Sequence, residues 1–319
     1  MAATQTPTTP AKSTRLGFGE ALLEIGRANP SVIALTADTY MLSCIELFDK
    51  ELPGRTFDVG IAEQNLVGIA AGLASCGMQP YVASYAPFLT ARSLEQVRND
   101  ICYPGFDVKI AAVCAGIAIS VGGSTHHAID DLAFLRAIPG IAILVPADAV
   151  ESYKLTLAMA KRFGPAYLRL GGRAAEPFLG MGDYPVEIGK AVQLRDGGDL
   201  TIIACGALVL PSLRAAEALA KEGVEARVLN MHTIKPLDKE AIVKAAKETG
   251  RIVTAEEHNV HGGLGGAVAE ILAQTVPTPV RMLGIPDVFA TIGGLQELYD
   301  RYNLNAEGVL ATAKAVLEA

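Results

Sequence analysis

Apolar runs rich in β-branched residues alternate with helix-type segments along most of the chain. Runs such as SVIALTAD and IAILVPAD predict buried strands, because a short and almost fully apolar segment is typical of a strand covered on both faces. The segment AVESYKLTLAMAKRF, which follows IAILVPAD, predicts a helix. This alternation indicates βαβ units around a mainly parallel sheet.

The alternation occurs in two blocks. The first covers residues 13–170, and the Gly- and Pro-containing stretch after it predicts a linker over residues 171–185. The pattern then restarts with runs such as DLTIIACG and RIVTAEEH, which predict a second, smaller α/β domain over residues 186–319. Residues 1–12 are polar and rich in Pro and Thr, and are predicted to be a disordered tail. We therefore expect two α/β domains with mainly parallel sheets.

Composition narrows the class of protein. Hydrophobic residues make up 50% of the 319 residues and charged residues 19%, so some of the apolar surplus is expected to line a protein interface. The net charge of −7 comes without a block of Lys or Arg, which argues against nucleic-acid binding. Five scattered cysteines indicate neither disulfides nor zinc and favour a reducing, cytoplasmic setting. The longest apolar run, Ile110–Val121, is too short to span a membrane.

The segment FDVGIAEQNLVGIAAGLASCG places Glu63 at the head of a run of small and apolar residues. On a helical projection one side carries Gly68, Gly72 and Ser75, and the other carries Glu63, Leu66, Ala70 and Leu73. Such a helix is expected to be buried all round, in a deep core or an interface. Glu63 is then either a first-turn acid favoured by the helix dipole or a buried functional acid that needs a partner.

Three motifs in order carry a resemblance to a known family. FDVGIAEQN with GIAAGLA, then YVASYAPFL, then STHHAIDDLAFLRAIPGIAILVPAD resemble the pyrimidine-binding domain of thiamine diphosphate enzymes of the transketolase and deoxyxylulose-phosphate synthase group. The resemblance extends from about Ser13 to the C-terminus, and the second block resembles the transketolase C-terminal domain. It implies transfer of a two-carbon ketol unit between a ketose, or ketose phosphate, and an aldose, or aldose phosphate.

The resemblance also implies roles for residues of the first domain. Glu63 would hydrogen-bond the aminopyrimidine of the cofactor and favour the tautomer that activates the thiazolium carbon. Phe88 would stack on the pyrimidine, with Tyr85 as a nearby polar group. Asp38 matches an acid near the cofactor, although an Asp that ends a strand is often only a turn or cap residue.

Further matches concern the sugar. Arg15 and Arg169 match arginines that bind the sugar phosphate, a task that suits a bidentate guanidinium. His126 matches a histidine at the mouth of the substrate site, with His127 beside it. Gly122 and Cys114 stand where transketolases commonly have an acid and a histidine, so sugar specificity is expected to differ.

One half of the expected cofactor site is missing. No Gly-Asp-Gly motif for Mg²⁺ and the diphosphate occurs, and the glycine-rich His261–Gly266 stretch lacks phosphate-loop spacing and favours a tight turn. We therefore expect no metal ligands in this chain. An N-terminal transketolase subunit is predicted to supply them in an α2β2 heterotetramer that binds thiamine diphosphate and Mg²⁺.

Two other functions stay open on these residues. One is the beta-type subunit of a 2-oxoacid dehydrogenase, which also supplies a Glu and a second α/β domain. The other is a non-catalytic binding or regulatory subunit, because fold alone does not imply function.

Overall fold

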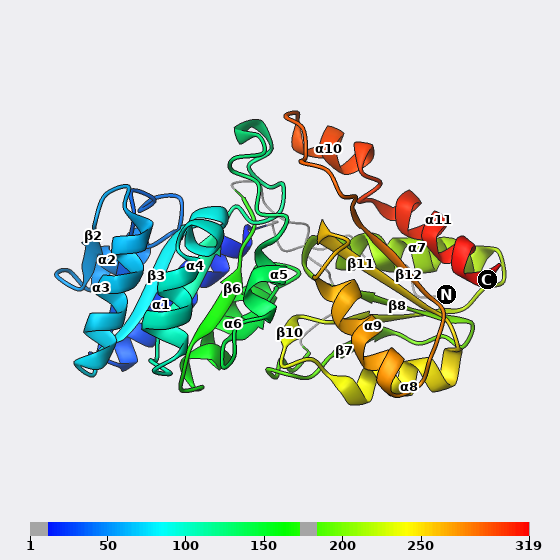
Figure 1. Cartoon of the computed structure of the whole chain (residues 1–319), viewed down its shortest axis with the longest axis horizontal. Helices are drawn as coiled ribbons and strands as arrows, with labels where there is room; N and C mark the ends of the chain where they lie inside the picture. Colours follow the sequence, from blue (N-terminus) through cyan, green and yellow to red (C-terminus); the bar gives the residue numbers. More distant parts are fainter. Residues whose placement is uncertain (1–11, 173–183, 319) are drawn as a thin grey trace.

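The computed structural model describes residues 12–172 and 184–318. The predicted tail, apart from Lys12, and most of the predicted linker lie outside these residues. Two sheets, each covered by helices on both faces, lie side by side in Figure 1. No helix among the described residues is long and apolar enough to cross a membrane.

The first sheet is parallel except at one edge. Its seven strands follow the order β10-β5-β6-β4-β3-β1-β2, and β10 alone runs antiparallel to its neighbour. The strands are β1 (Val32–Thr36), β2 (Thr56–Asp58), β3 (Gln79–Tyr85), β4 (Lys109–Val113), β5 (Ala142–Leu144), β6 (Ala166–Arg169) and β10 (Thr233–Lys235). Because the parallel strands share one direction, the loops that follow them meet at one edge of the sheet.

Helices cover both faces of this sheet, which explains why its central strands are mostly apolar. One face packs against α1 (Thr14–Ala28), α2 (Glu46–Glu51) and α6 (Ala149–Ala160). The other packs against α3 (Glu63–Ser75), α4 (Leu94–Gln96), α5 (Asp131–Arg136) and the π-helical turns η1 (Phe88–Arg92) and η2 (Val97–Cys102). Helices α1 and α6 begin at side-chain caps, since Ser13 accepts from the backbone of α1 and Asp148 from that of α6.

The second sheet has five strands in the order β12-β11-β8-β9-β7, with only β7 antiparallel. They are β7 (Val192–Arg195), β8 (Leu200–Ala204), β9 (Ala226–Asn230), β11 (Ile252–Asn259) and β12 (Val280–Ile285). The helices of this domain are α7 (Val209–Lys221), α8 (Lys239–Thr249), α9 (Leu264–Gln274), α10 (Leu295–Arg301) and α11 (Ala306–Leu317). A short 3-10 turn, η4 (Gly206–Leu208), precedes α7, and another, η3 (Ser120–Gly122), lies in the first domain. The expectation of two α/β domains with mainly parallel sheets is confirmed.

One strand crosses between the predicted domains. The run EARVLNMHTI contributes to two strands, because the chain leaves the second sheet after Asn230 and Thr233–Lys235 pairs with β5 of the first sheet. Ile234 thereby joins the same apolar cluster as Ile143. The two domains consequently share a continuous core.

Helix α3 differs from its prediction. Glu63, Leu66 and Ala70 are buried as expected, but Gly72 and Ser75 on the other side are exposed. The expectation of burial all round is therefore wrong for the single chain, because no described element of this chain covers the glycine side. A Cβ built on Gly68 or Gly72 would meet nothing within 4 Å. The alternative of an interface helix stays a prediction.

Candidate active site

Four of the residues singled out in the sequence meet at the carboxyl edge of the first sheet. Glu63 begins α3 soon after β2, Tyr85 ends β3, and Phe88 begins the π-helical turn η1 that follows. His126 lies in the long loop after β4. Residues far apart in the sequence are thus brought together by the parallel order of β1, β2, β3 and β4.

Glu63 is 3% exposed, and its carboxylate is paired with an arginine that the motifs did not indicate. Arg92 Nη1 lies 2.7 Å from Glu63 Oε2, and the Arg92 side chain is 44% exposed. A buried carboxylate is costly without a partner, and this ion pair gives Glu63 a counter-charge. Nothing in the sequence signals the pairing, because residues 63 and 92 meet only through the packing of α3 against η1.

Phe88, Tyr85 and His126 form an edge-to-face group. The ring centroids of Phe88 and His126 are 5.1 Å apart, those of Tyr85 and Phe88 are 5.8 Å apart, and those of Tyr85 and His126 are 5.9 Å apart. Such contacts favour a defined ring orientation. His126 Nδ1 also lies 3.1 Å from the hydroxyl oxygen of Thr125. His127, by contrast, points into the protein, and its burial lowers its pKa.

Asp38 is exposed just beyond β1, with a left-handed backbone (φ 54°). Its N–H donates to Asp58 Oδ1 at 3.0 Å, and the same oxygen accepts from the N–H of Gly60 at 2.9 Å. Asp58 therefore ties the loop after β1 to the loop that leads into Glu63. Sequence reasoning missed Asp58, although an Asp at a strand end before a glycine is a recognisable turn signal.

The two predicted phosphate-binding arginines are buried away from this group. Arg15 donates to the backbone carbonyls of Leu42 and Gly172. Arg169 Nε lies 2.8 Å from Asp131 Oδ2, and Arg169 Nη2 also donates to the carbonyls of Ala128 and Glu257. Burial acts to raise the pKa of Asp131, but the attraction of Arg169 outweighs it and holds that pKa below its usual value.

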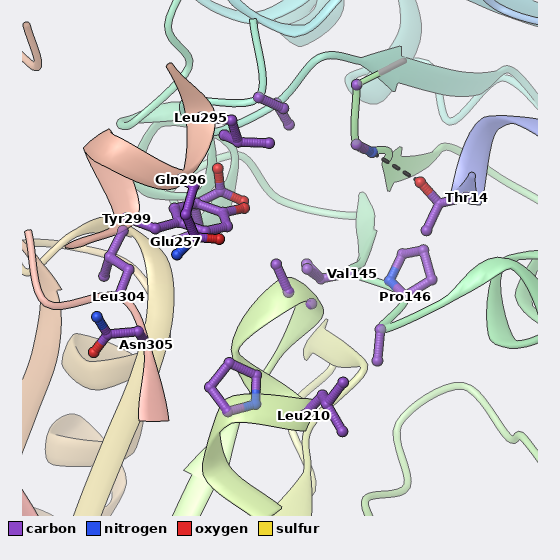
Figure 2. Close-up of a pocket in the computed structure, with 18 of the residues that line it drawn as sticks. Thr14, Val145, Pro146, Leu210, Glu257, Leu295, Gln296, Tyr299, Leu304 and Asn305 are labelled. Atoms are coloured by element: carbon purple, nitrogen blue, oxygen red, sulfur yellow. Dashed lines mark hydrogen bonds between the residues drawn. The ribbon is translucent and has the colours of Figure 1, made fainter. Parts of the chain in front are cut away.

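A cavity of about 740 Å³ lies between the two domains (Figure 2). Arg169 lines it, as do Thr14 and Glu257, whereas Glu63, Phe88 and His126 do not. Of the two predicted phosphate arginines, Arg169 thus lines a cavity that the predicted cofactor residues do not line. Ile117 N donates to Glu257 Oε1 at 2.9 Å, so Glu257 of the second domain supports the base of the loop that carries His126. Burial raises the pKa of Glu257 to about 7.

The glycine-rich stretch after His261 binds a side chain of this chain. The backbone N–H groups of Leu264 and Gly265 donate to the carboxylate of Glu256, at 2.7 and 2.8 Å. These donors at the start of α9 are the groups that a phosphate would need. The stretch is thus a tight, internally satisfied turn. Among the described residues no group of three or more His, Cys, Asp or Glu side chains is placed to hold a metal ion.

Residues 11–175 match the transketolase pyrimidine-binding domain, and residues 189–309 match the transketolase C-terminal domain. The chain belongs to the transketolase family. The resemblance in the sequence is thereby confirmed, and the transketolase family depends on thiamine diphosphate.

Several relatives of transketolase type have nearly the same length as this chain. The chain is 44% identical over 299 residues to an apulose-4-phosphate transketolase subunit of Phocaeicola vulgatus, covering 94% of this chain and 96% of that protein. It is 38% identical over 301 residues to the 6-deoxy-6-sulfo-D-fructose transketolase subunit SqwH of a Clostridium species, covering 94% and 93%. A solved structure described as a split gene transketolase, inactive beta4 tetramer, is 41% identical with a TM-score of 0.87 and covers 97% and 99%.

Proposed function

We propose that this chain supplies the pyrimidine-binding half of a transketolase and acts with a separate subunit that binds Mg²⁺ and the cofactor diphosphate. The family and the full-length matches to split subunits support a transketolase subunit, and they do not favour the 2-oxoacid dehydrogenase alternative. The reaction is transfer of a two-carbon ketol unit from a ketose to an aldose. Two copies of each subunit form the proposed assembly.

The single observation that carries this proposal is that the buried carboxylate of Glu63 and the face of the Phe88 ring both contact one planar, nitrogen-rich group. A carboxylate that is 3% exposed lies in reach of a planar nitrogen group stacked on Phe88, here the guanidinium of Arg92. An aminopyrimidine needs the same set of contacts, an acceptor at its edge and an aromatic ring at its face. The residues present therefore fit the pyrimidine half of thiamine diphosphate.

Each residue then has a role in the proposed reaction. Bound thiamine diphosphate would supply the nucleophilic carbon and the electron sink for ketol transfer. Glu63 holds a proton at the ring nitrogen of the pyrimidine, while Phe88 orients the ring, with Tyr85 beside it. His126, against the edge of Phe88, meets the sugar at the mouth of the site. Asp38 lines the outer rim, where its exposed carboxylate faces the proposed partner.

The substrate class is proposed as sugars that end in an anionic group. The two relatives above are named for a sugar phosphate and a sulfo-sugar, which share this chemistry. Arg15 and Arg169 stay candidates for the anion, although each is already hydrogen-bonded within the chain. Gly122 and Cys114 leave the sugar hydroxyls without the acid and histidine common in transketolases, so discrimination among sugars should differ.

The test is proton exchange at the thiazolium carbon in the complex reconstituted with its partner. Glu63→Gln should keep the fold and the assembly but slow exchange by roughly 10²–10⁴-fold, because it removes a positioned acid–base group. Glu95→Gln is the matched control, since Glu95 is an exposed residue whose side chain hydrogen-bonds within the same segment, to Gln96 and Asn99. Exchange that is equally fast in wild type and Glu63→Gln would refute the assignment.

A further inference from the structure

Arg92 makes two contacts at once in the candidate site. Its Nη1 lies 2.7 Å from the buried carboxylate of Glu63, and its guanidinium carbon lies 3.9 Å from the centroid of the Phe88 ring. The first contact is an ion pair and the second a close cation–π contact. Both come from one side chain, because the π-helical turn η1 brings Phe88 and Arg92 to the same side.

We propose that Arg92 is an internal stand-in for the aminopyrimidine, which the cofactor must displace when it binds. This inference rests on the proposed function, which assigns the pyrimidine to the same carboxylate and the same aromatic face. A guanidinium is planar and delocalised and presents N–H donors in its plane, so it satisfies the contacts that a flat, nitrogen-rich ring would make. The two groups cannot hold these contacts together, and cofactor entry becomes an exchange.

The burial of the two charges supports an exchange. Glu63 is 3% exposed, and a carboxylate at that depth without a counter-charge would destabilise the chain. Arg92 is 44% exposed on a long side chain, so it can rotate into solvent without unfolding its segment. The arginine thus keeps Glu63 paired before assembly and can leave afterwards. The chain is protected from an uncompensated buried charge in the period before its partner and cofactor arrive.

The proposal predicts opposite effects on the chain alone and on the complex. Arg92→Met keeps an unbranched side chain of similar length but removes the charge and the planar donors. The isolated chain should lose thermal stability, because Glu63 is left unpaired. In the complex reconstituted with its partner, thiamine diphosphate should bind about tenfold more tightly, because the competing ion pair is gone, and tenfold corresponds to about 1.4 kcal/mol.

The measurements are thermal unfolding of the isolated full chain and calorimetric titration of the reconstituted complex with thiamine diphosphate and Mg²⁺. Arg98→Met is the matched control, since Arg98 is an exposed arginine in the next turn whose side chain hydrogen-bonds the neighbouring Asn99. It should change neither quantity. Adding Glu63→Gln to Arg92→Met should restore the stability of the isolated chain, because no buried charge then remains unpaired.

The outcomes separate this inference from the proposed function. Tighter cofactor binding by Arg92→Met supports the stand-in. Binding that is unchanged or weaker, in a complex whose wild type binds the cofactor, overturns the stand-in alone and leaves the proposed function in place. If neither the wild type nor Arg92→Met binds thiamine diphosphate with the partner present, the stand-in and the proposed function are both overturned.

Discussion

Glu63 and Arg169 are both buried charged residues, but the ion-pair partner of Glu63 is exposed whereas that of Arg169 is buried. The partner of Glu63 is an arginine that is 44% exposed and reaches it from one side. Arg169 and Asp131 are both buried, and the hydroxyl of Tyr167 adds a third contact to the carboxylate at 2.6 Å. A pair whose two members are both buried stabilises the fold, whereas a pair with one exposed member leaves its buried acid accessible once that member turns away.

Arg169→Ala should destabilise the full chain by roughly 3–5 kcal/mol, because Asp131 would remain as a buried charge without a counter-charge. Urea unfolding of the purified chain measures this loss. Arg27→Ala is the control, since Arg27 and Glu51 are both more than half exposed and such pairs contribute less than about 1 kcal/mol. Equal losses in the two variants would contradict a structural role for Arg169.

Part of the site was predictable at this scale. Glu63, Phe88, Tyr85 and His126 lie in motifs of contiguous sequence, and the structure brings these four together. Arg92 was not predictable, because its partner lies 29 positions earlier and no motif links the two. The ion pair of Arg169 was hidden for the same reason, since Asp131 lies 38 positions away. Their proposed roles in binding stay predictions.

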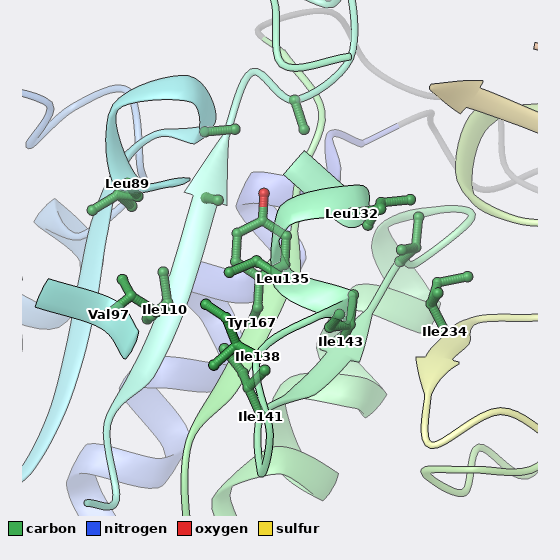
Figure 3. Close-up of a cluster of buried hydrophobic side chains, with 14 of the residues drawn as sticks. Leu89, Val97, Ile110, Leu132, Leu135, Ile138, Ile141, Ile143, Tyr167 and Ile234 are labelled. Carbon is green, nitrogen blue, oxygen red and sulfur yellow. The ribbon is translucent and has the colours of Figure 1, made fainter. Parts of the chain in front are cut away.

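At the scale of elements, the period and length of apolar runs predicted most strands. They did not predict how the second domain contacts the first. Strand β10 has only three residues and follows β9 after two others, so the sequence shows one run. Its place is decided by packing, as Ile234 lies at the edge of the cluster in Figure 3, which also contains Ile143 of β5. Propensity along the chain cannot indicate which of two sheets a short strand joins.

The glycine side of helix α3 is open in the isolated chain. Gly68 lies mid-helix with open space where a Cβ would be, so Gly68→Ala should stabilise the isolated chain by about 0.5–1 kcal/mol through helix propensity. If this side packs against the partner, the larger Gly68→Gln should leave the chain folded and weaken assembly at least roughly tenfold, because overpacking typically costs about 1–3 kcal/mol.

Unfolding of the isolated chain and titration with the partner measure the two effects. Gly198→Gln is the control, because Gly198 also has open space around it but lies in the other domain, outside the proposed interface. Normal assembly by Gly68→Gln would show that this side of α3 does not face the partner.

At the scale of the whole molecule, the joint between the domains depends on buried acids. Glu257 of β11 accepts from Ile117 N, and position 116 requires glycine because a Cβ there would meet the Glu257 carboxyl carbon at 2.4 Å. Burial raises the pKa of Glu257 to about 7, with Arg169 opposing that rise and Asp131 adding to it. The joint that supports the His126 loop is consequently sensitive to pH.

The sign of this dependence follows from the two states. A glutamate in the unfolded chain titrates near 4.5, whereas Glu257 in the folded chain holds its proton up to about pH 7. Below the unfolded value both states are protonated and Glu257 has no effect on the pH dependence. Between the two values the unfolded state releases its proton first, so the free energy of unfolding falls, and above pH 7 the loss is complete.

Glu257→Gln should therefore be more stable relative to wild type at pH 8 than at pH 5, by roughly 1–3 kcal/mol, because the amide has no proton to lose and still accepts from Ile117 N. Urea unfolding at the two pH values, at one protein concentration, measures the difference. Glu240→Gln, at a side chain that is 88% exposed, is the control and should show no such difference. A Glu257→Gln effect that is the same at pH 5 and pH 8 would mean that Glu257 is already ionised in the folded chain, and that burial between the domains does not hold its proton.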